Sequence, residues 1–274
     1  MLSTVFCLLP TLYCKFDKNI DMSNDAYVRS SFKNGITTIE FHHPHSNSLP
    51  GKMLEQLAHA IHGAGNDEDT LVIILRSAGE NVFCSGASFD ELMAIQDAEQ
   101  GLQFFSGFAH VINNMRICPK FIIGRIHGKC VGGGVGLAAA VDYAIAVQGA
   151  SVKLSELAVG IGPFVVGPAV ERKIGASAFS QLAIDSGSWR DAGWASRKGL
   201  FAELHPDIKG MDDSIQQLTT QLVHSSPEAM AAMKKIFWKG TEHWDTLLIE
   251  RAAISGRLVL SSFTRQAIEK FRKK

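Results

Sequence analysis

The sequence predicts an α/β fold in which strands alternate with helices over about the first 150 residues, while helices dominate the rest. Two continuous apolar runs, residues 71–75 (LVIIL) and 121–126 (FIIGRI), are typical of strands buried on both faces of a sheet. Helical spacing is the other signal, and one apolar stripe consists of Met53, Leu54, Leu57, Ala58 and Ile61.

The elements follow in order along the chain. Residues 35–41 (GITTIEF) are rich in β-branched side chains and predict a strand, whereas HHPHSNSLPG after them has the composition of a loop. The helix of the apolar stripe and the strand at 71–75 come next. A short apolar stretch then enters a glycine-containing turn, and a helix is expected from Asp90 onward.

The same succession repeats in the middle of the chain. The strand at 121–126 leads into a glycine-rich turn over 127–136, a small-residue helix at 137–141 and a strand at 143–147. From Pro168 the pattern is mainly helical. Ser226 and Pro227 have the order of an N-cap and a first helical residue, and the last long segment, 244–271, also predicts a helix.

Composition excludes several classes of protein. Lys plus Arg and Asp plus Glu both count 27, and hydrophobic residues make up 46%, so the chain is neither disordered nor basic enough for a dedicated nucleic-acid binder. The five cysteines are odd in number and form no C-x-x-C pair. We therefore expect reduced cysteines, no metal site of this type and a cytoplasmic protein.

The first 21 residues form an apolar segment that Pro10 interrupts and that no basic residue precedes, unlike a signal peptide. We expect residues 1–21 to be an extension outside the fold. Residues 22–274 are expected to form a single domain, with a core at about 27–200 and a helical region at about 201–274. No later stretch reaches transmembrane length, so no membrane partner is expected.

The strongest candidate site is the glycine run from Gly132 to Gly136, between a predicted strand and a small-residue helix. Glycines let a backbone approach a ligand closely, and a helix N-terminus favours an anion or an oxyanion formed during a reaction. The structural alternative is a tight crossing in which the helix and strand backbones touch.

Two further features indicate a functional site when they are considered together with this turn. Ser85, Gly86, Ala87 and Ser88 form a second turn after an apolar stretch, although alone it could be a simple turn. Glu156 stands among apolar residues, a setting that raises a carboxyl pKa and suits general acid/base work. By itself Glu156 could equally be an exposed residue after a strand.

Three rival interpretations are weaker. The residues from Gly134 match G-x-G-x-x-A, and Glu156 follows Gly136 by about 20 residues, as in a dinucleotide site, but the predicted strand ends near Ile126, too far upstream. A serine hydrolase using Ser85 or Ser88 lacks the G-x-S-x-G motif. The histidines of HHPH are better explained as a solvated loop than as metal ligands.

Four stretches, FCSGASFDEL, HGKCVGGGVGLAAAVDYAIA, LSELAVGIGPFVVGPAVERKIG and SWRDAGWASRKGLFAEL, stand in the order of the signature stretches of the enoyl-CoA hydratase/isomerase (crotonase) family. The resemblance covers roughly residues 27–274, and bacterial methylglutaconyl-CoA hydratase-like proteins are especially similar. It implies a crotonase-like spiral of repeated ββα units with a helical C-terminal region, assembled as a homotrimer or a dimer of trimers. It also implies acyl-CoA thioester substrates, with coenzyme A as part of the substrate and no separate cofactor.

The resemblance also implies roles for single residues. Glu156 would be the catalytic acid/base, and the backbone N–H groups of Ala87 and Gly133 would form the oxyanion hole. The residues that would border the substrate or its CoA part are Ser85, Gly86, Ser88, Gly132, Gly136, Pro163 and Lys270.

The sequence departs from the family pattern at three positions. The first of the two glutamates of well-known hydratases corresponds to Gly136, an aspartate often found in the first turn corresponds to Ser88, and the aspartate of dienoyl-CoA isomerases corresponds to Phe164. One carboxylate suits a 1,3-proton shift, but it can also serve hydration if it both activates water and protonates C2. The resemblance favours a hydratase acting on a branched or carboxylated enoyl-CoA. The alternatives are an isomerase and a non-catalytic acyl-CoA-binding protein.

Overall fold

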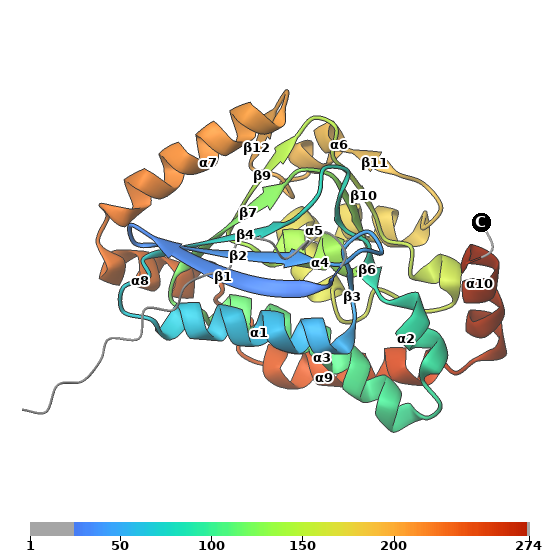
Figure 1. Ribbon diagram of the computed structural model, residues 1–274. Coiled ribbons are helices and arrows are strands. Elements are labelled where there is room, and N and C mark those ends of the chain that lie inside the picture. Colours follow the sequence, from blue (N-terminus) through green and yellow to red (C-terminus); the bar gives the residue numbers. More distant parts are fainter. Residues whose placement is uncertain (1–24, 273–274) are drawn as a thin grey trace, which may run out of the picture.

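A six-stranded sheet forms the centre of the molecule in the computed structural model, which describes residues 25–272 (Figure 1). The expected extension at 1–21 lies outside these residues. The strand order is β1-β2-β4-β7-β9-β12, and every neighbouring pair is parallel except β1 with β2. The strands are β1 (Tyr27–Lys33), β2 (Ile36–His42), β4 (Val72–Ser77), β7 (Phe121–Ile126), β9 (Tyr143–Val147) and β12 (Glu203–His205).

Short strands pair beside this sheet, so each unit has two strands and a helix, and the fold consists of repeated ββα units as the resemblance implies. A four-stranded sheet has the order β11-β10-β8-β5, and a third sheet pairs β3 with β6. These strands are β3 (Ser48–Leu49), β5 (Val82–Cys84), β6 (Gly86–Ala87), β8 (Lys129–Val131), β10 (Ser151–Lys153) and β11 (Arg190–Asp191). Successive units, β7-β8-α4 and β9-β10-α5 for example, therefore place their second strands side by side.

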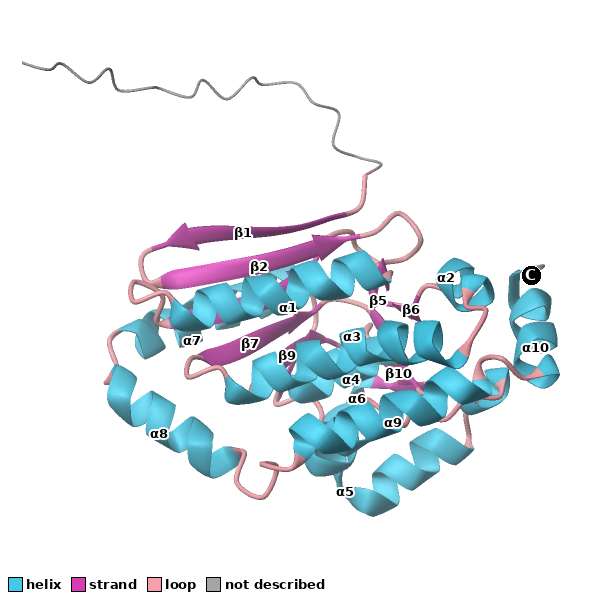
Figure 2. Ribbon diagram, turned by 90° about the horizontal axis from the view of Figure 1, so that it is seen from below, coloured by secondary structure: helices cyan, strands magenta, loops and turns pink. Residues whose placement is uncertain are grey.

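Helices cover both faces of the large sheet (Figures 1 and 2). On one face lie α1 (Gly51–Asn66), α3 (Ala98–Ile117) and α9 (Trp244–Leu258), and α7 (Ile208–Val223) packs on the other. All five residues of the predicted stripe on α1 are buried, because that stripe faces the sheet. The other helices are α2 (Phe89–Ala94), α4 (Gly133–Ala140), α5 (Gly167–Ile184), α6 (Ala192–Arg197), α8 (Pro227–Phe237) and α10 (Ser262–Arg272).

The segment expected to be only a glycine-rich turn contains a strand and the start of a helix. β8 ends at Val131, and α4 begins at Gly133 rather than near Leu137. The predicted strand does end at Ile126, as β7, but β8 follows it and reaches the turn, so the distance from a strand is no argument against a dinucleotide site. β8 has only three residues, and the first of them, Lys129, is charged, so the sequence pattern is too short to reveal a strand.

Other differences from the sequence prediction have a similar cause. β1 is largely exposed, and β11 and β12 have only two and three residues, so none carries a continuous apolar run. The last helical segment divides into α9 and α10 at residues 259–261. Ser226 and Pro227 do begin α8, where the Ser226 side chain accepts a hydrogen bond from the Ala229 N–H.

A buried ion pair fixes the end of the sheet opposite to the glycine turn. Lys234 Nζ of α8 lies 2.8 Å from Asp142 Oδ2 and donates to the Lys120 carbonyl. Asp142 also accepts hydrogen bonds from the Ile122 N–H and from Trp238 Nε1. Because the charged groups are almost fully buried and well hydrogen-bonded, this network holds α8 against β7 and the start of β9.

No helix among residues 25–272 is long and apolar enough to cross a membrane. In the same part of the chain, Cys84, Cys118 and Cys130 are buried free thiols.

Removal of Lys234 should strongly destabilise the fold, because it leaves the Asp142 carboxylate buried without its cation. We expect Lys234→Met to lower the free energy of unfolding by about 3–5 kcal/mol, measured by urea denaturation. The exposed neighbour Lys235 provides the control, and Lys235→Met should change it by no more than about 0.5 kcal/mol. Equal effects of both changes would contradict this account of the ion pair.

Candidate active site

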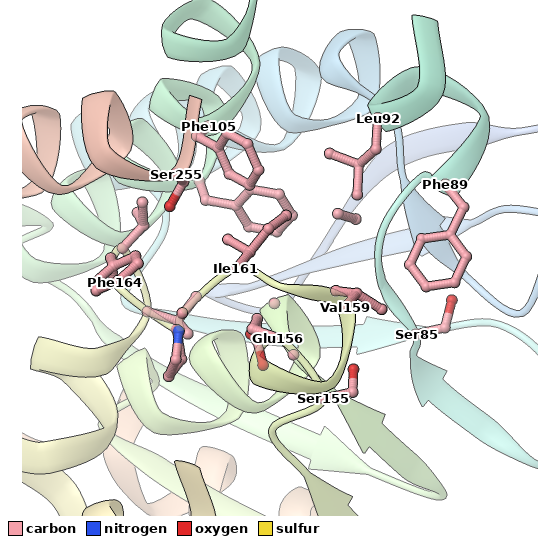
Figure 3. A pocket seen from close by; sticks show the side chains of 18 residues that line it. Ser85, Phe89, Leu92, Phe105, Ser155, Glu156, Val159, Ile161, Phe164 and Ser255 are labelled. Carbon is pink, nitrogen blue, oxygen red and sulfur yellow. The ribbon is translucent and has the colours of Figure 1, made fainter. Parts of the chain in front are cut away.

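A pocket lies where the second strands of the ββα units end (Figure 3). Its walls come from the β5–α2 turn, the start of α4, the segment after β10, and helices α3 and α9. It is lined by Ser85, Ala87, Phe89, Leu92, Phe105, Phe108, Gly132, Gly133, Ser155, Glu156, Val159, Ile161, Gly162, Pro163, Phe164, Val165, Val166 and Ser255. This lining is mainly apolar, and Glu156 is its single titratable side chain among the described residues.

Glu156 is held by a tight turn between β10 and α5. Its carbonyl accepts hydrogen bonds from the Val159 and Ile161 N–H groups, and residues Leu157–Val159 form one turn of 3-10 helix, η1. A Cβ on Gly132 would lie 3.0 Å from Glu156 Oε1. The carboxyl group therefore lies directly against the glycine turn, where any side chain at residue 132 would displace it.

The Glu156 carboxyl is poorly solvated. The residue is partly exposed on the pocket side, but Oε2 is buried and has no hydrogen-bond partner. Burial raises the pKa of Glu156 to about 7, against a usual value of 4.5. Near neutral pH the group is therefore divided between its acid and base forms, as a group that both removes and returns a proton requires.

The two candidate oxyanion turns lie in contact. Gly86 has a φ of 84°, and a Cβ there would lie 2.8 Å from the Val131 oxygen and 3.0 Å from the Gly133 nitrogen. Gly133 is the first residue of α4, so its N–H has no acceptor within the helix. Ala87 follows Gly86 and lines the same pocket. Both predicted donor residues therefore line the pocket that holds the carboxyl of Glu156.

Gly136, which we expected to border the substrate, lies behind the pocket wall. A Cβ on Gly136 would lie 2.5 Å from Val166 Cγ1, and Val166 itself lines the pocket. A valine side chain therefore fills the space next to Gly136, the position that the resemblance aligns with the first glutamate. Gly136 packs against Val166 and is not among the lining residues, and its contact with a substrate stays a prediction.

The other predicted residues divide into two groups. Ser85, Gly132 and Pro163 line the pocket, as expected. Gly86 lies beneath it as the close backbone contact, and the Ser88 hydroxyl caps α2 by accepting a hydrogen bond from the Glu91 N–H. Ser88 faces an adjoining hollow of the surface. Lys270 is exposed on α10 and is not part of the lining.

No local sequence pattern identifies the residues of the remaining pocket wall. Phe105 and Phe108 lie on the apolar side of α3, where their spacing indicates burial but no particular cavity. Ser255 of α9 is about 100 residues from Glu156 in the sequence, and no local pattern connects them. Phe164 was noted only as a replacement for an acidic residue, although its ring forms part of the lining.

The architecture has close counterparts among solved structures. An enoyl-CoA hydratase from Bacillus halodurans superposes with a TM-score of 0.82 over 89% of this chain and 99% of its own, at 22% sequence identity. At that identity the likeness establishes the fold, which is the crotonase fold of repeated ββα units.

Sequence comparison establishes the family. A model described as enoyl-CoA hydratase/isomerase matches residues 31–270, and the chain therefore belongs to the enoyl-CoA hydratase/isomerase family. Carnitinyl-CoA dehydratase of Escherichia coli (strain K12) is 30% identical over 210 residues, which are 75% of this chain and 78% of that protein. A probable enoyl-CoA hydratase of Bacillus subtilis (strain 168) is 26% identical over 204 residues, or 74% and 78% of the two chains.

The raised pKa of Glu156 has a consequence for stability. The folded protein binds this proton more tightly than the unfolded chain, so the stabilisation is complete below about pH 4.5 and is lost as the pH rises through about 7. Glu156→Gln carries no such charge. We compare the unfolding free energy of the variant with that of the wild type at each pH. From pH 5 to pH 8 this difference should change by roughly 1–3 kcal/mol in favour of the variant. Urea denaturation at both pH values measures the gain, and a pH-independent difference would contradict the assignment.

Proposed function

We propose that this protein adds water to, or removes it from, a 2-enoyl-CoA thioester. The observation that carries the proposal is the Glu156 carboxyl, with a pKa of about 7, placed against the Gly132–Gly133 turn inside an apolar pocket. The names of the relatives, a probable enoyl-CoA hydratase and a carnitinyl-CoA dehydratase, support this type of reaction.

In the hydration direction, ionised Glu156 removes a proton from water while the water oxygen bonds to C3 of the substrate. The electrons of the C2=C3 bond move onto the thioester oxygen, which becomes an enolate. The backbone N–H groups of Ala87 and Gly133 donate hydrogen bonds to that oxygen, and one such donor contributes about 10²–10³-fold in rate. Glu156 then returns its proton to C2, the thioester forms again, and the carboxylate is restored.

The proposed reaction needs no separate cofactor, because coenzyme A enters as part of the substrate. The homotrimer or dimer of trimers and the cytoplasmic location stay predictions. Exposed apolar side chains on α8, Met233, Ile236 and Phe237, support self-association, since such a patch favours burial against another surface.

A second candidate is double-bond isomerisation by the same residues. The packing of Val166 against Gly136 favours it, because the pocket then offers one carboxyl group among its described residues and an apolar wall where a second could hold water. In this reaction Glu156 removes a proton from C2 of a 3-enoyl-CoA and returns it to C4, and no water is consumed.

Glu156→Gln should lower turnover at least about 10²-fold while leaving the binding of acyl-CoA esters intact, because the amide keeps the shape but cannot accept a proton. Glu171→Gln, at an exposed glutamate, is the matched control and should retain full activity. For the wild type, kcat/KM for hydration should rise with pH through about 7, as the carboxyl ionises.

The reaction itself is identified by incubating the wild type with 2-enoyl-CoA and with 3-enoyl-CoA in H₂¹⁸O. Label at C3 of the product supports the hydratase, and a shifted double bond without label supports the isomerase instead. Tight binding of the esters without turnover, or full activity of Glu156→Gln, would contradict both.

Substitutions at Gly136 test whether the absence of a second carboxyl group limits hydration. Gly136→Glu alone should fold poorly, because its Cβ lies 2.5 Å from Val166 Cγ1. A Cβ at residue 136 would also lie 2.7 Å from the Val166 Cβ, so Val166→Gly is needed to make space for the new side chain. If the single carboxyl limits hydration, the double variant should incorporate ¹⁸O at least about tenfold faster than Val166→Gly, since a general acid/base contributes roughly 10²–10⁴-fold. Equal rates in a folded double variant would show that Glu156 alone suffices.

A further inference from the structure

The part of the pocket beyond Glu156 is where the acyl group of a substrate would bind. Figure 3 shows Phe105, Phe164 and Ser255 on one side of Glu156, and Ser85 and Phe89 on the other. Ser85, Ala87 and Phe89 also line an adjoining hollow with His45 and Asp90, whose side chains are mostly exposed. The pocket therefore opens to solvent on the Ser85 side, and its opposite side is the inner end.

Rigid elements close this inner end. α3 and α9 cross in direct backbone contact, since a Cβ on Gly101 would lie 2.5 Å from the Gly256 oxygen. Gly256 is the neighbour of Ser255, and Gly101 lies one helical turn before Phe105. Phe105 and Ser255 are 8% and 1% exposed, so neither helix can move aside without breaking a close-packed contact.

Phe164 completes the closure on the third side. Its N–H donates to the Gly162 carbonyl at 2.7 Å, which forms a tight turn, and a Cβ on Gly162 would lie 2.5 Å from the Phe164 ring. The ring thus folds back over Gly162 and is partly exposed to the pocket. Unlike Phe105, it belongs to a loop before α5, so its removal opens space without separating two helices.

The inner end also lacks any group that could neutralise a charged acyl chain. The lining described above contains no lysine, arginine or histidine, and its one titratable group becomes negative on ionisation. A carboxylate placed there would lose its hydration without gaining a counter-ion, which disfavours its binding.

We propose, on the basis of the function proposed above, that the substrates carry a short, uncharged acyl group and that Phe164 sets its length. A carboxylated acyl chain of the methylglutaconyl type fits this lining poorly, whereas a short branched chain matches its apolar surface.

Binding of saturated acyl-CoA esters tests this proposal independently of turnover. Isovaleryl-CoA and malonyl-CoA have the same number of heavy atoms beyond the thioester carbonyl. The first ends in an isopropyl group and the second in a carboxylate. Calorimetry with the wild type should show that isovaleryl-CoA binds at least about tenfold more tightly than malonyl-CoA. The same margin is expected over octanoyl-CoA, whose acyl chain is too long for the pocket. Equal affinity for isovaleryl-CoA and malonyl-CoA would overturn the charge argument.

Phe164→Ala should raise the affinity for octanoyl-CoA at least about tenfold and change that for isovaleryl-CoA by no more than about threefold. Phe32→Ala, at an exposed phenylalanine of β1, is the control and should leave both unchanged. Unaltered octanoyl-CoA binding by a folded Phe164→Ala variant would overturn the role of Phe164. If isovaleryl-CoA binds as expected but no enoyl-CoA is converted, the proposed reaction fails and the acyl preference stands.

Discussion

The site depends above all on one constraint, the contact between two backbones that only glycine permits. A Cβ on Gly134 would lie 2.3 Å from the Cys84 oxygen, and one on Gly133 would lie 2.3 Å from the Phe108 ring. Gly132 has a φ of 51°, in a region that side chains disfavour. The β5–β6 turn and the start of α4 can therefore touch, and this contact brings the Ala87 and Gly133 backbones to one pocket. The sequence left two interpretations of this turn, a tight backbone crossing and a candidate oxyanion site. In the structure one turn can serve as both.

The buried carboxyl group of Glu156 is the second requirement of the site, and its ionisation lowers the stability of the folded protein. Ionised Glu156 has one oxygen without a partner, so folding pushes the group toward its neutral form. The turn that holds it is supported from outside by α10, since Gly160 leaves room for Phe263 and Thr264 and a Cβ there would lie 2.5 Å from the Phe263 ring. The same helix reaches the other wall, where Arg265 donates to the Ile95 carbonyl after α2. α10 therefore contacts both the turn that carries Glu156 and the end of α2, the helix that follows the candidate oxyanion donor Ala87.

Features with a strong local signal were predictable from the sequence. The strands at 121–126 and 143–147 have the predicted bounds, and the glycine turn and Glu156 do meet in one pocket. β8 and β10 were missed because strands of three residues carry no measurable period. Phe105, Val166 and Ser255 were missed as lining residues for another reason. Their positions result from the packing of α3, α5 and α9, which depends on contacts far apart in the sequence.

The relation between Gly136 and Val166 connects the chemistry of the site to its specificity. At this position a carboxyl group would bring both a proton-transfer group and a hydrated charge into the pocket. With glycine behind valine, the wall next to the glycine turn is apolar, and it continues through Val165 and Ile161. Glycine at this position leaves Glu156 as the one carboxyl among the described lining residues, and it leaves no polar side chain there that could accompany a charged acyl group. The raised pKa of the single carboxyl and the proposed preference for uncharged acyl groups both follow from the apolar lining around Glu156, because such a lining disfavours any ionised group that lacks a partner.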